Sequence, residues 1–104
     1  MKTFKDLEFK PRGDGKFGYG VGAKYTFDND VTISVQAGRF NYSTPREDLT
    51  SPNDFTSFEV AVLESPNGDL ITQDFVPDAG DDVLGWQDRA QINELMLLIQ
   101  SENN

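Results

Sequence analysis

The chemistry that this chain could perform is limited first by the residue types that it lacks. The sequence contains no histidine and no cysteine. The lack of histidine removes the most common general base and the imidazole metal ligands, and the lack of cysteine removes disulfides and thiolate metal sites. Carboxylates are the main remaining candidates. They gather around Gly80, at Asp74, Asp78, Asp81 and Asp82.

This acidic cluster allows more than one interpretation. Clusters of oxygen ligands can bind Ca²⁺ or Mg²⁺, but the spacing here is not that of an EF-hand. Paired carboxylates can act as acid and base in glycoside hydrolysis, although any acidic chain supplies such pairs. We therefore predict no catalytic residue, no cofactor and no metal site. The cluster is expected to be a solvated acidic surface that a partner protein could contact.

The segment GDGKFG, residues 13–18, has the glycine spacing of a dinucleotide-binding loop. Such a loop needs a strand before the glycines and a helix after them, so that the phosphates meet the helix N-terminus. Here an alternating segment follows instead. We predict a turn and then a strand with one face bare of side chains, against which a bulky group could lie. The glycines of that face are Gly18, Gly20 and Gly22.

The pattern of apolar residues predicts two β-hairpins. Polar and apolar residues alternate over 17–27 and 31–37, Phe58, Val60 and Val62 share one face of a strand over 57–64, and residues 69–76 are the predicted returning strand. Turn-forming residues at 28–30 join the first pair, and Asn67-Gly68 joins the second. Residues 4–10 fit either a further short strand or an irregular arm.

Residues 88–101 have the features of a helix. Asp88 and Gln91 form a potential capping box, and the helical period then places a set of apolar residues on one stripe. That stripe contains Ile92, Leu95, Met96 and Ile99. Leu97 lies nearly opposite, where it is either simply exposed or contacts a second subunit. The expected fold is one α+β domain over 1–104, an antiparallel sheet of four or five strands with one C-terminal helix packed on it.

A long polar segment, residues 41–56, separates the two predicted hairpins. It contains Tyr42 and Arg46, and exposed aromatic and arginine residues on loops are typical interface anchors. The alternative is a loop in which Leu49 and Phe55 turn inward. Trp86 follows the acidic linker 77–85, and we predict that it packs that linker against the sheet, with ligand stacking as the alternative.

The charge of the chain is −9 and is unevenly distributed. Residues 1–27 carry six basic and three acidic groups, a net +3, whereas residues 28–104 carry three basic and fifteen acidic groups, a net −12. This acidity disfavours direct nucleic-acid binding and favours a basic partner. The N-terminus has no signal-peptide pattern, and the longest apolar run, LMLLI, is too short to span a membrane. We expect a cytoplasmic protein.

The segments FKDLEF, TFDND, VTISV, FEVAVL and DDVLGW together resemble small acidic bacteriophage accessory proteins. The resemblance implies a phage origin and the cytoplasm of an infected bacterium. Small acidic phage proteins without catalytic residues are often inhibitors of host proteins, so we expect a non-enzymatic inhibitor of a host defence or nucleic-acid-processing protein with a basic surface. The alternative is an assembly protein that self-associates, through its C-terminal helix or through the glycine-faced strand. The predicted contact residues are Asp74, Asp78, Asp81, Asp82, Tyr42, Arg46 and Leu97.

Overall fold

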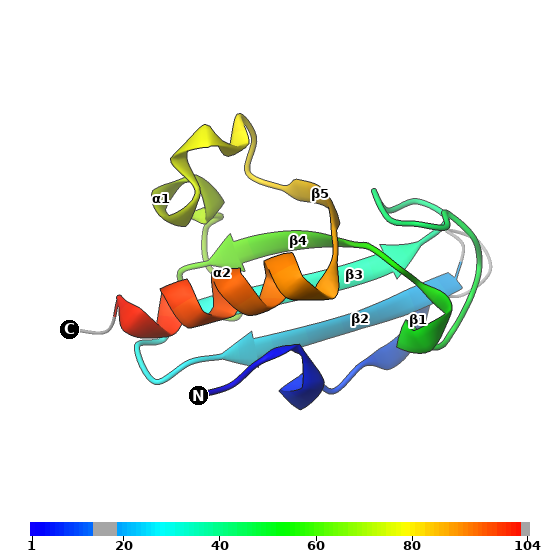
Figure 1. Cartoon of the computed structure of the whole chain (residues 1–104), viewed down its shortest axis with the longest axis horizontal. Helices are drawn as coiled ribbons and strands as arrows, with labels where there is room; N and C mark the ends of the chain where they lie inside the picture. The colour runs from blue at the N-terminus through cyan, green and yellow to red at the C-terminus, as the bar shows by residue number, and fades with distance from the viewer. Residues whose placement is uncertain (14–18, 103–104) are drawn as a thin grey trace.

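The computed structural model describes residues 1–13 and 19–102. Figure 1 shows one twisted sheet with a long helix lying across one of its faces. Neighbouring strands are antiparallel and follow one another in sequence order, so the sheet is a simple meander. The strands are β1 (Lys10–Gly13), β2 (Tyr19–Thr26), β3 (Thr32–Gly38), β4 (Phe58–Leu63) and β5 (Leu84–Gln87). The predicted α+β fold is confirmed, with five strands in the sheet.

The long helix of this face begins where the sequence predicts. The Asp88 side chain accepts a hydrogen bond from the Gln91 N–H at 2.8 Å, and the Gln91 side chain accepts one from the Asp88 N–H at 2.9 Å, which completes the capping box. The helical segments are η1 (Phe4–Asp6), η2 (Pro52–Asp54), α1 (Thr72–Phe75), η3 (Pro77–Ala79) and α2 (Arg89–Ser101). Within the described ranges, none of them is both long and apolar enough to cross a membrane.

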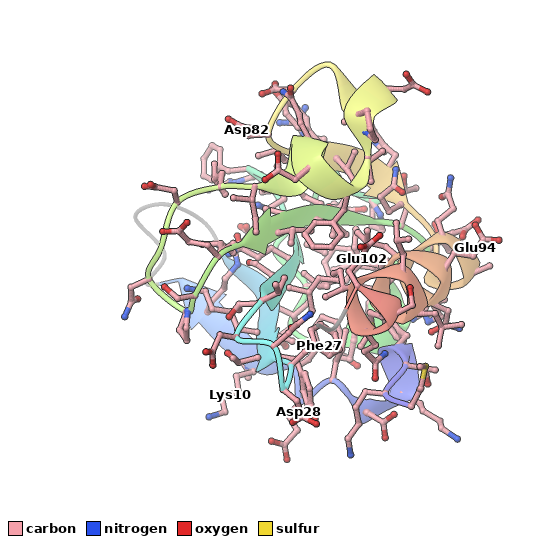
Figure 2. The ribbon with its side chains drawn as sticks, turned by 90° about the vertical axis from the view of Figure 1, so that its left-hand side faces the viewer. Lys10, Phe27, Asp28, Asp82, Glu94 and Glu102 are labelled. Carbon is pink, nitrogen blue, oxygen red and sulfur yellow. The ribbon has the colours of Figure 1, made fainter. Side chains whose placement is uncertain are left out.

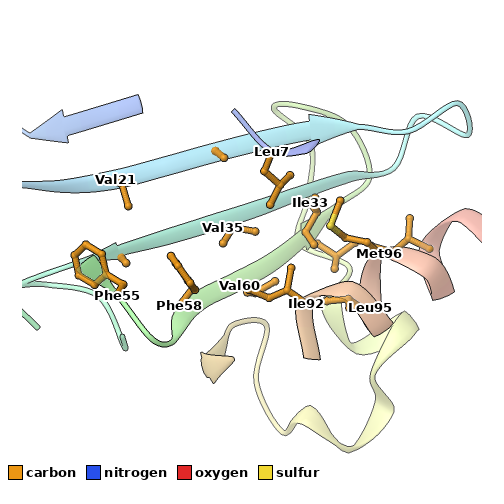
Figure 3. Close-up of a cluster of buried hydrophobic side chains, with 14 of the residues drawn as sticks. Leu7, Val21, Ile33, Val35, Phe55, Phe58, Val60, Ile92, Leu95 and Met96 are labelled. Carbon is orange, nitrogen blue, oxygen red and sulfur yellow. The ribbon is translucent and has the colours of Figure 1, made fainter. Parts of the chain in front are cut away.

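The hydrophobic core lies between α2 and one face of the sheet. Strand register aligns apolar residues across this face, with Val35 opposite Ala23 on β2 and Val60 on β4. Figure 3 shows Ile92 and Met96 of α2 packed over this row. The predicted helical stripe is buried in full, at Ile92, Leu95, Met96 and Ile99. Each large aliphatic side chain buried in this way contributes about 1.5–3 kcal/mol.

The glycine face of β2 is filled by the chain itself at the two positions that the structure describes. A Cβ on Gly20 would collide with the backbone oxygen of Ala37 on β3, so a side chain is excluded there. A Cβ on Gly22 would lie 3.4 Å from Cδ of Arg12, whose side chain crosses over this glycine from β1. These two glycines therefore serve the packing of the sheet. Gly18 lies outside the described residues.

The second predicted hairpin is wrong beyond its turn. The turn at 65–68 forms, closed by a 3.0 Å hydrogen bond between its end residues. Pro66 at its second position has a fixed negative φ, so this turn is not one of the I′ or II′ turns that best continue into a twisted hairpin. Pairing stops after a single bridge between Leu63 and Leu70. After Ile71, whose N–H donates to the Val62 carbonyl at 2.7 Å, residues 72–76 leave the sheet, and β5 takes the place beside β4.

A buried hydroxyl explains why the chain turns away at this point. The Thr72 side chain is 0% exposed, and its Oγ1 accepts a hydrogen bond from the Val62 N–H at 2.9 Å. The same hydroxyl donates to the Asp82 carbonyl at 2.6 Å. Thr72 therefore joins the end of β4 to the acidic segment before β5, and helix α1 begins at this residue.

Replacing Thr72 by valine is expected to lower the free energy of unfolding by about 1–3 kcal/mol, because a buried N–H and a carbonyl would lose their partner. Urea denaturation followed by circular dichroism measures this change. Serine at the same position keeps the hydroxyl, so Thr72→Ser should be clearly less destabilising than Thr72→Val. Equal stability of Thr72→Val and the parent protein would contradict this role.

The long polar segment 41–56 is packed against the body of the protein. Phe55 is 1% exposed and joins the core, and Leu49 packs against it. The Thr56 N–H donates to the Thr44 carbonyl at 2.8 Å, which closes the loop onto the start of β4. The inward-packed alternative is therefore the one observed for these two apolar residues, while Tyr42 remains 48% exposed.

Candidate functional site

The predicted contact residues lie in separate parts of the structure. Asp74 is on α1, Asp78 on η3, and Asp81 and Asp82 in the turn before β5, while Leu97 is on α2 and is 41% exposed. Tyr42 and Arg46, in the loop after β3, are the two that contact each other. The Arg46 guanidinium carbon lies 5.5 Å from the centre of the Tyr42 ring.

The acidic cluster does not form a metal site among the residues that the structure describes. The Asp81 carboxylate accepts a hydrogen bond from the Asp82 N–H at 2.7 Å, so it shapes its own turn. Figure 2 shows Asp82 and Asp28 at opposite ends of the view, and Glu94 at its side. The negative charge is therefore spread around the molecule, and the turn before β5 is one part of it.

A groove of about 580 Å³ lies between the N-terminal segment, the β2–β3 turn and the end of α2. Its polar groups serve the fold. The Gln100 side chain accepts from the Lys2 N–H and donates to the Lys2 carbonyl, both at 2.8 Å, and Asp6 accepts from the Thr3 N–H at 2.9 Å. The Gln100 bonds fasten the N-terminal segment to α2, and the Asp6 bond caps η1 within that segment. We therefore assign this groove a structural role.

The most unusual exposed feature is a pair of aromatic rings beside β5. The rings of Tyr42 and Trp86 have centroids 5.1 Å apart and are tilted by 34°. A hydrogen bond of 2.9 Å from the Trp86 N–H to the Tyr42 carbonyl fixes their backbones together. The two side chains are nevertheless 48% and 55% exposed, respectively. We call Tyr42 and Trp86 the aromatic platform.

A β-bulge in β5 orients the tryptophan. Phe58 pairs with Gln87 and Val60 pairs with Leu84, so a two-residue step on β4 faces a three-residue step on β5. Bulges of this kind re-aim a side chain and occur next to functional sites. Trp86 in the bulge has φ of 53°, a left-handed conformation that costs an L-residue about 1–2 kcal/mol. The fold therefore tolerates backbone strain at Trp86, the more exposed of the two rings of the platform.

The partner ring is held equally firmly. A Cβ on Gly85 would lie 3.0 Å from Cβ of Tyr42, so the glycine allows the two segments to approach. Glu59 accepts hydrogen bonds from the Tyr42 N–H at 3.1 Å and from the Asn41 side-chain amide at 3.0 Å. Partial burial lowers the pKa of Arg12, and the negative charge of Glu59 opposes that shift. Glu59 thus anchors the loop that carries Tyr42.

The Trp86→Gly variant is expected to have a higher free energy of unfolding than the Trp86→Ala variant. Both variants lose the indole, but only glycine adopts a positive φ without strain. After subtracting the greater chain entropy of glycine in the unfolded state, Trp86→Gly should exceed Trp86→Ala in unfolding free energy by about 0.5–1 kcal/mol. Chemical denaturation of the two variants side by side tests this difference. A less stable glycine variant would show that Trp86 is not strained.

Trp86 was predicted to pack the linker against the sheet, and it instead stacks on Tyr42 with half of its surface exposed. The residue types of Tyr42 and Arg46 already indicated an interface. The partnership of Tyr42 with Trp86 could not be predicted, because it depends on a bulge between strands that are distant in the sequence. The Gly85-Trp86 pair is the one local signal, since it combines a position without a side chain and a large ring.

Comparisons with protein-family models, with curated proteins and with solved structures each found no match. The resemblance to phage accessory proteins therefore stays a prediction. The assignment of the aromatic platform as the candidate site rests on the geometry of this chain alone.

Proposed function

We propose that this protein is a non-enzymatic binding protein that contacts a partner protein through the aromatic platform. The observation that carries the proposal is the half-exposed, rigidly held pair of Tyr42 and Trp86, one of them in a strained backbone conformation. Tryptophan, tyrosine and arginine dominate the binding energy of interfaces. A ring that is already fixed loses little conformational entropy on binding, so preorganisation adds to affinity.

The proposed partner has a basic surface. The charge of −9 supports this, because a net negative protein attracts a positive surface over distances near the Debye length and repels nucleic-acid phosphates. The acidic residues before β5 adjoin the platform along the chain, at Asp74, Asp78, Asp81 and Asp82. They would form an electrostatic rim that accelerates association more than it strengthens the final complex.

The resemblance to small acidic phage accessory proteins supports a narrower proposal about the partner. It suggests a phage-encoded inhibitor that acts in the cytoplasm of an infected bacterium. The target would be a host defence or nucleic-acid-processing protein, since such proteins present basic channels that an acidic binder can occupy. The lack of histidine and cysteine is in keeping with stoichiometric binding rather than turnover.

Self-association through α2 is the second candidate function. It is favoured by Leu97 and Leu98, which are 41% and 38% exposed on this helix. Pairing through the β1 edge is less attractive, because Pro11 lacks an N–H and exposed Lys10 adds charge to this edge. The helix is therefore a better candidate surface for self-association than the β1 edge.

Capture from a bacterial lysate by the immobilised protein, followed by mass spectrometry, tests the two candidates. The binding proposal predicts one stoichiometric basic protein whose recovery falls steeply as salt is raised. Leu97→Ala should retain this protein, and Trp86→Gly should lose it. Recovery of the bait alone as a discrete oligomer, or a capture that does not depend on Trp86, would contradict the binding proposal.

A further inference from the structure

We propose that the exposed surface of the Trp86 indole receives the guanidinium group of an arginine on the partner protein. This inference rests on the binding function proposed above and specifies its central contact. It is suggested by the way in which the chain uses its own arginines and rings. The expected contact is a planar stack in which the indole face attracts the delocalised positive charge.

Arginine stacking is the recurring mode of polar packing in this protein. The guanidinium carbon of Arg39 lies 5.0 Å from the centre of the Phe40 ring, and that of Arg46 lies 5.5 Å from the centre of the Tyr42 ring. Arg89 lies 4.9 Å from the Phe4 ring and 5.2 Å from the Phe58 ring. Arg39, Arg46 and Arg89 are the only basic residues of the acidic part of the chain, residues 28–104, and each of them covers a ring.

Trp86 is the exception in this arrangement. Indole has the most negative ring face of the aromatic side chains and is the best partner for a cation. In the ranges that the structure describes, no cation lies over this ring, although 55% of the residue is exposed. Its described ring contact is with Tyr42. The strongest cation-binding ring of the chain is therefore held in place, and no described residue places a cation over it.

The carboxylates that neighbour Trp86 along the chain favour a cationic occupant, while the positive charge of Arg46 is already placed over the other ring of the platform, Tyr42. Three carboxylates lie within five residues of it along the chain, at Asp81, Asp82 and Asp88, and the chain as a whole carries −9. An approaching phosphate or carboxylate group would be repelled, whereas a positive group would be attracted. A guanidinium is preferred to an ammonium because it is planar and more weakly hydrated, so less hydration is lost when it stacks.

The test compares two dye-labelled peptides that differ in one chemical group. Both contain the same glycine and serine residues, and one carries three arginines where the other carries three lysines. Fluorescence anisotropy at low salt measures their dissociation constants for the full chain. We expect the arginine peptide to bind about three- to tenfold more tightly than the lysine peptide. Trp86→Leu should abolish this preference, Trp86→Phe should retain part of it, and Phe40→Leu should retain all of it.

Two results would overturn the inference. One is equal affinity of the parent protein for both peptides, which would show that only net charge is recognised. The other is an arginine preference that survives in Trp86→Leu. Failure of the inference is distinguishable from failure of the proposed function. If a lysate partner still depends on Trp86 while the peptides bind equally, the function stands and the guanidinium contact is wrong.

Discussion

Replacement of Arg89 by alanine is expected to lower the free energy of unfolding by about 3 kcal/mol, the largest effect of any single charged residue in this protein. Its guanidinium donates hydrogen bonds to the carbonyls of Phe55 at 3.0 Å and Pro52 at 2.9 Å. It also lies over the rings of Phe4 and Phe58. One side chain thus joins the start of α2 to the long loop, the N-terminal segment and the sheet.

The position of Arg89 makes this role clearer. A cation in the first turn of a helix opposes the helix dipole, so the residue is unfavourable for α2 taken alone. The contacts with two carbonyls and two rings outweigh that cost. Alanine would remove the side-chain donor from the Phe55 carbonyl, would leave the Pro52 carbonyl with only the Phe55 N–H at 3.3 Å, and would expose the edge of the phenylalanine cluster.

Urea denaturation of three variants tests this account of Arg89. Arg89→Lys keeps the charge but loses the planar fork, so we expect a smaller loss, of about 1–2 kcal/mol. Arg46→Ala removes an arginine from an exposed ring and serves as the matched control, with a loss below about 1 kcal/mol. If Arg89→Ala were no more destabilising than Arg46→Ala, Arg89 would not join these segments.

The second large effect concerns binding. Trp86→Gly is expected to weaken the affinity for the captured partner by about thirtyfold or more, which corresponds to a hot spot of about 2 kcal/mol. The backbone at this position already has a positive φ of 53°, so glycine keeps the bulge while removing the ring. Loss of binding by this variant can therefore be attributed to the indole and not to a disturbed fold.

Calorimetric titration of the purified partner provides this measurement. Leu97→Ala is the matched control because it removes another large exposed apolar side chain, on α2 instead of β5, and its affinity should stay within about twofold of the parent protein. If Leu97→Ala lost affinity and Trp86→Gly did not, the binding surface would lie on α2 and the proposed site would be wrong.

The parts of the fold that the sequence predicted well are those with local causes. Helix α2 has its capping box and its apolar stripe within one short segment, so neither depends on distant contacts. The first hairpin was predicted for the same reason. Asn29 accepts the Val31 N–H within the turn, and Asp30 takes a positive φ that aspartate tolerates.

The parts that were missed depend on partners far along the chain. Residues 69–76 follow an Asn-Gly turn and were therefore predicted as the returning strand, but Thr72 bonds to Val62 and Asp82 and diverts the chain into α1. Trp86 was predicted to pack the linker 77–85 against the sheet. Its exposure results from a bulge opposite β4, which no local pattern around Trp86 encodes. Long-range hydrogen bonds therefore determine the path of residues 69–76, and strand register determines the exposure of Trp86.

The most direct test of the proposed binding surface is a nuclear magnetic resonance titration of the ¹⁵N-labelled protein with the captured partner. The chain contains a single tryptophan, so the indole N–H of Trp86 gives one isolated resonance. The account predicts that this resonance shifts or broadens at the first additions of partner, together with the amides of Tyr42 and Gly85. An unchanged indole resonance, with shifts centred on Leu97 and Leu98, would contradict binding through the aromatic platform.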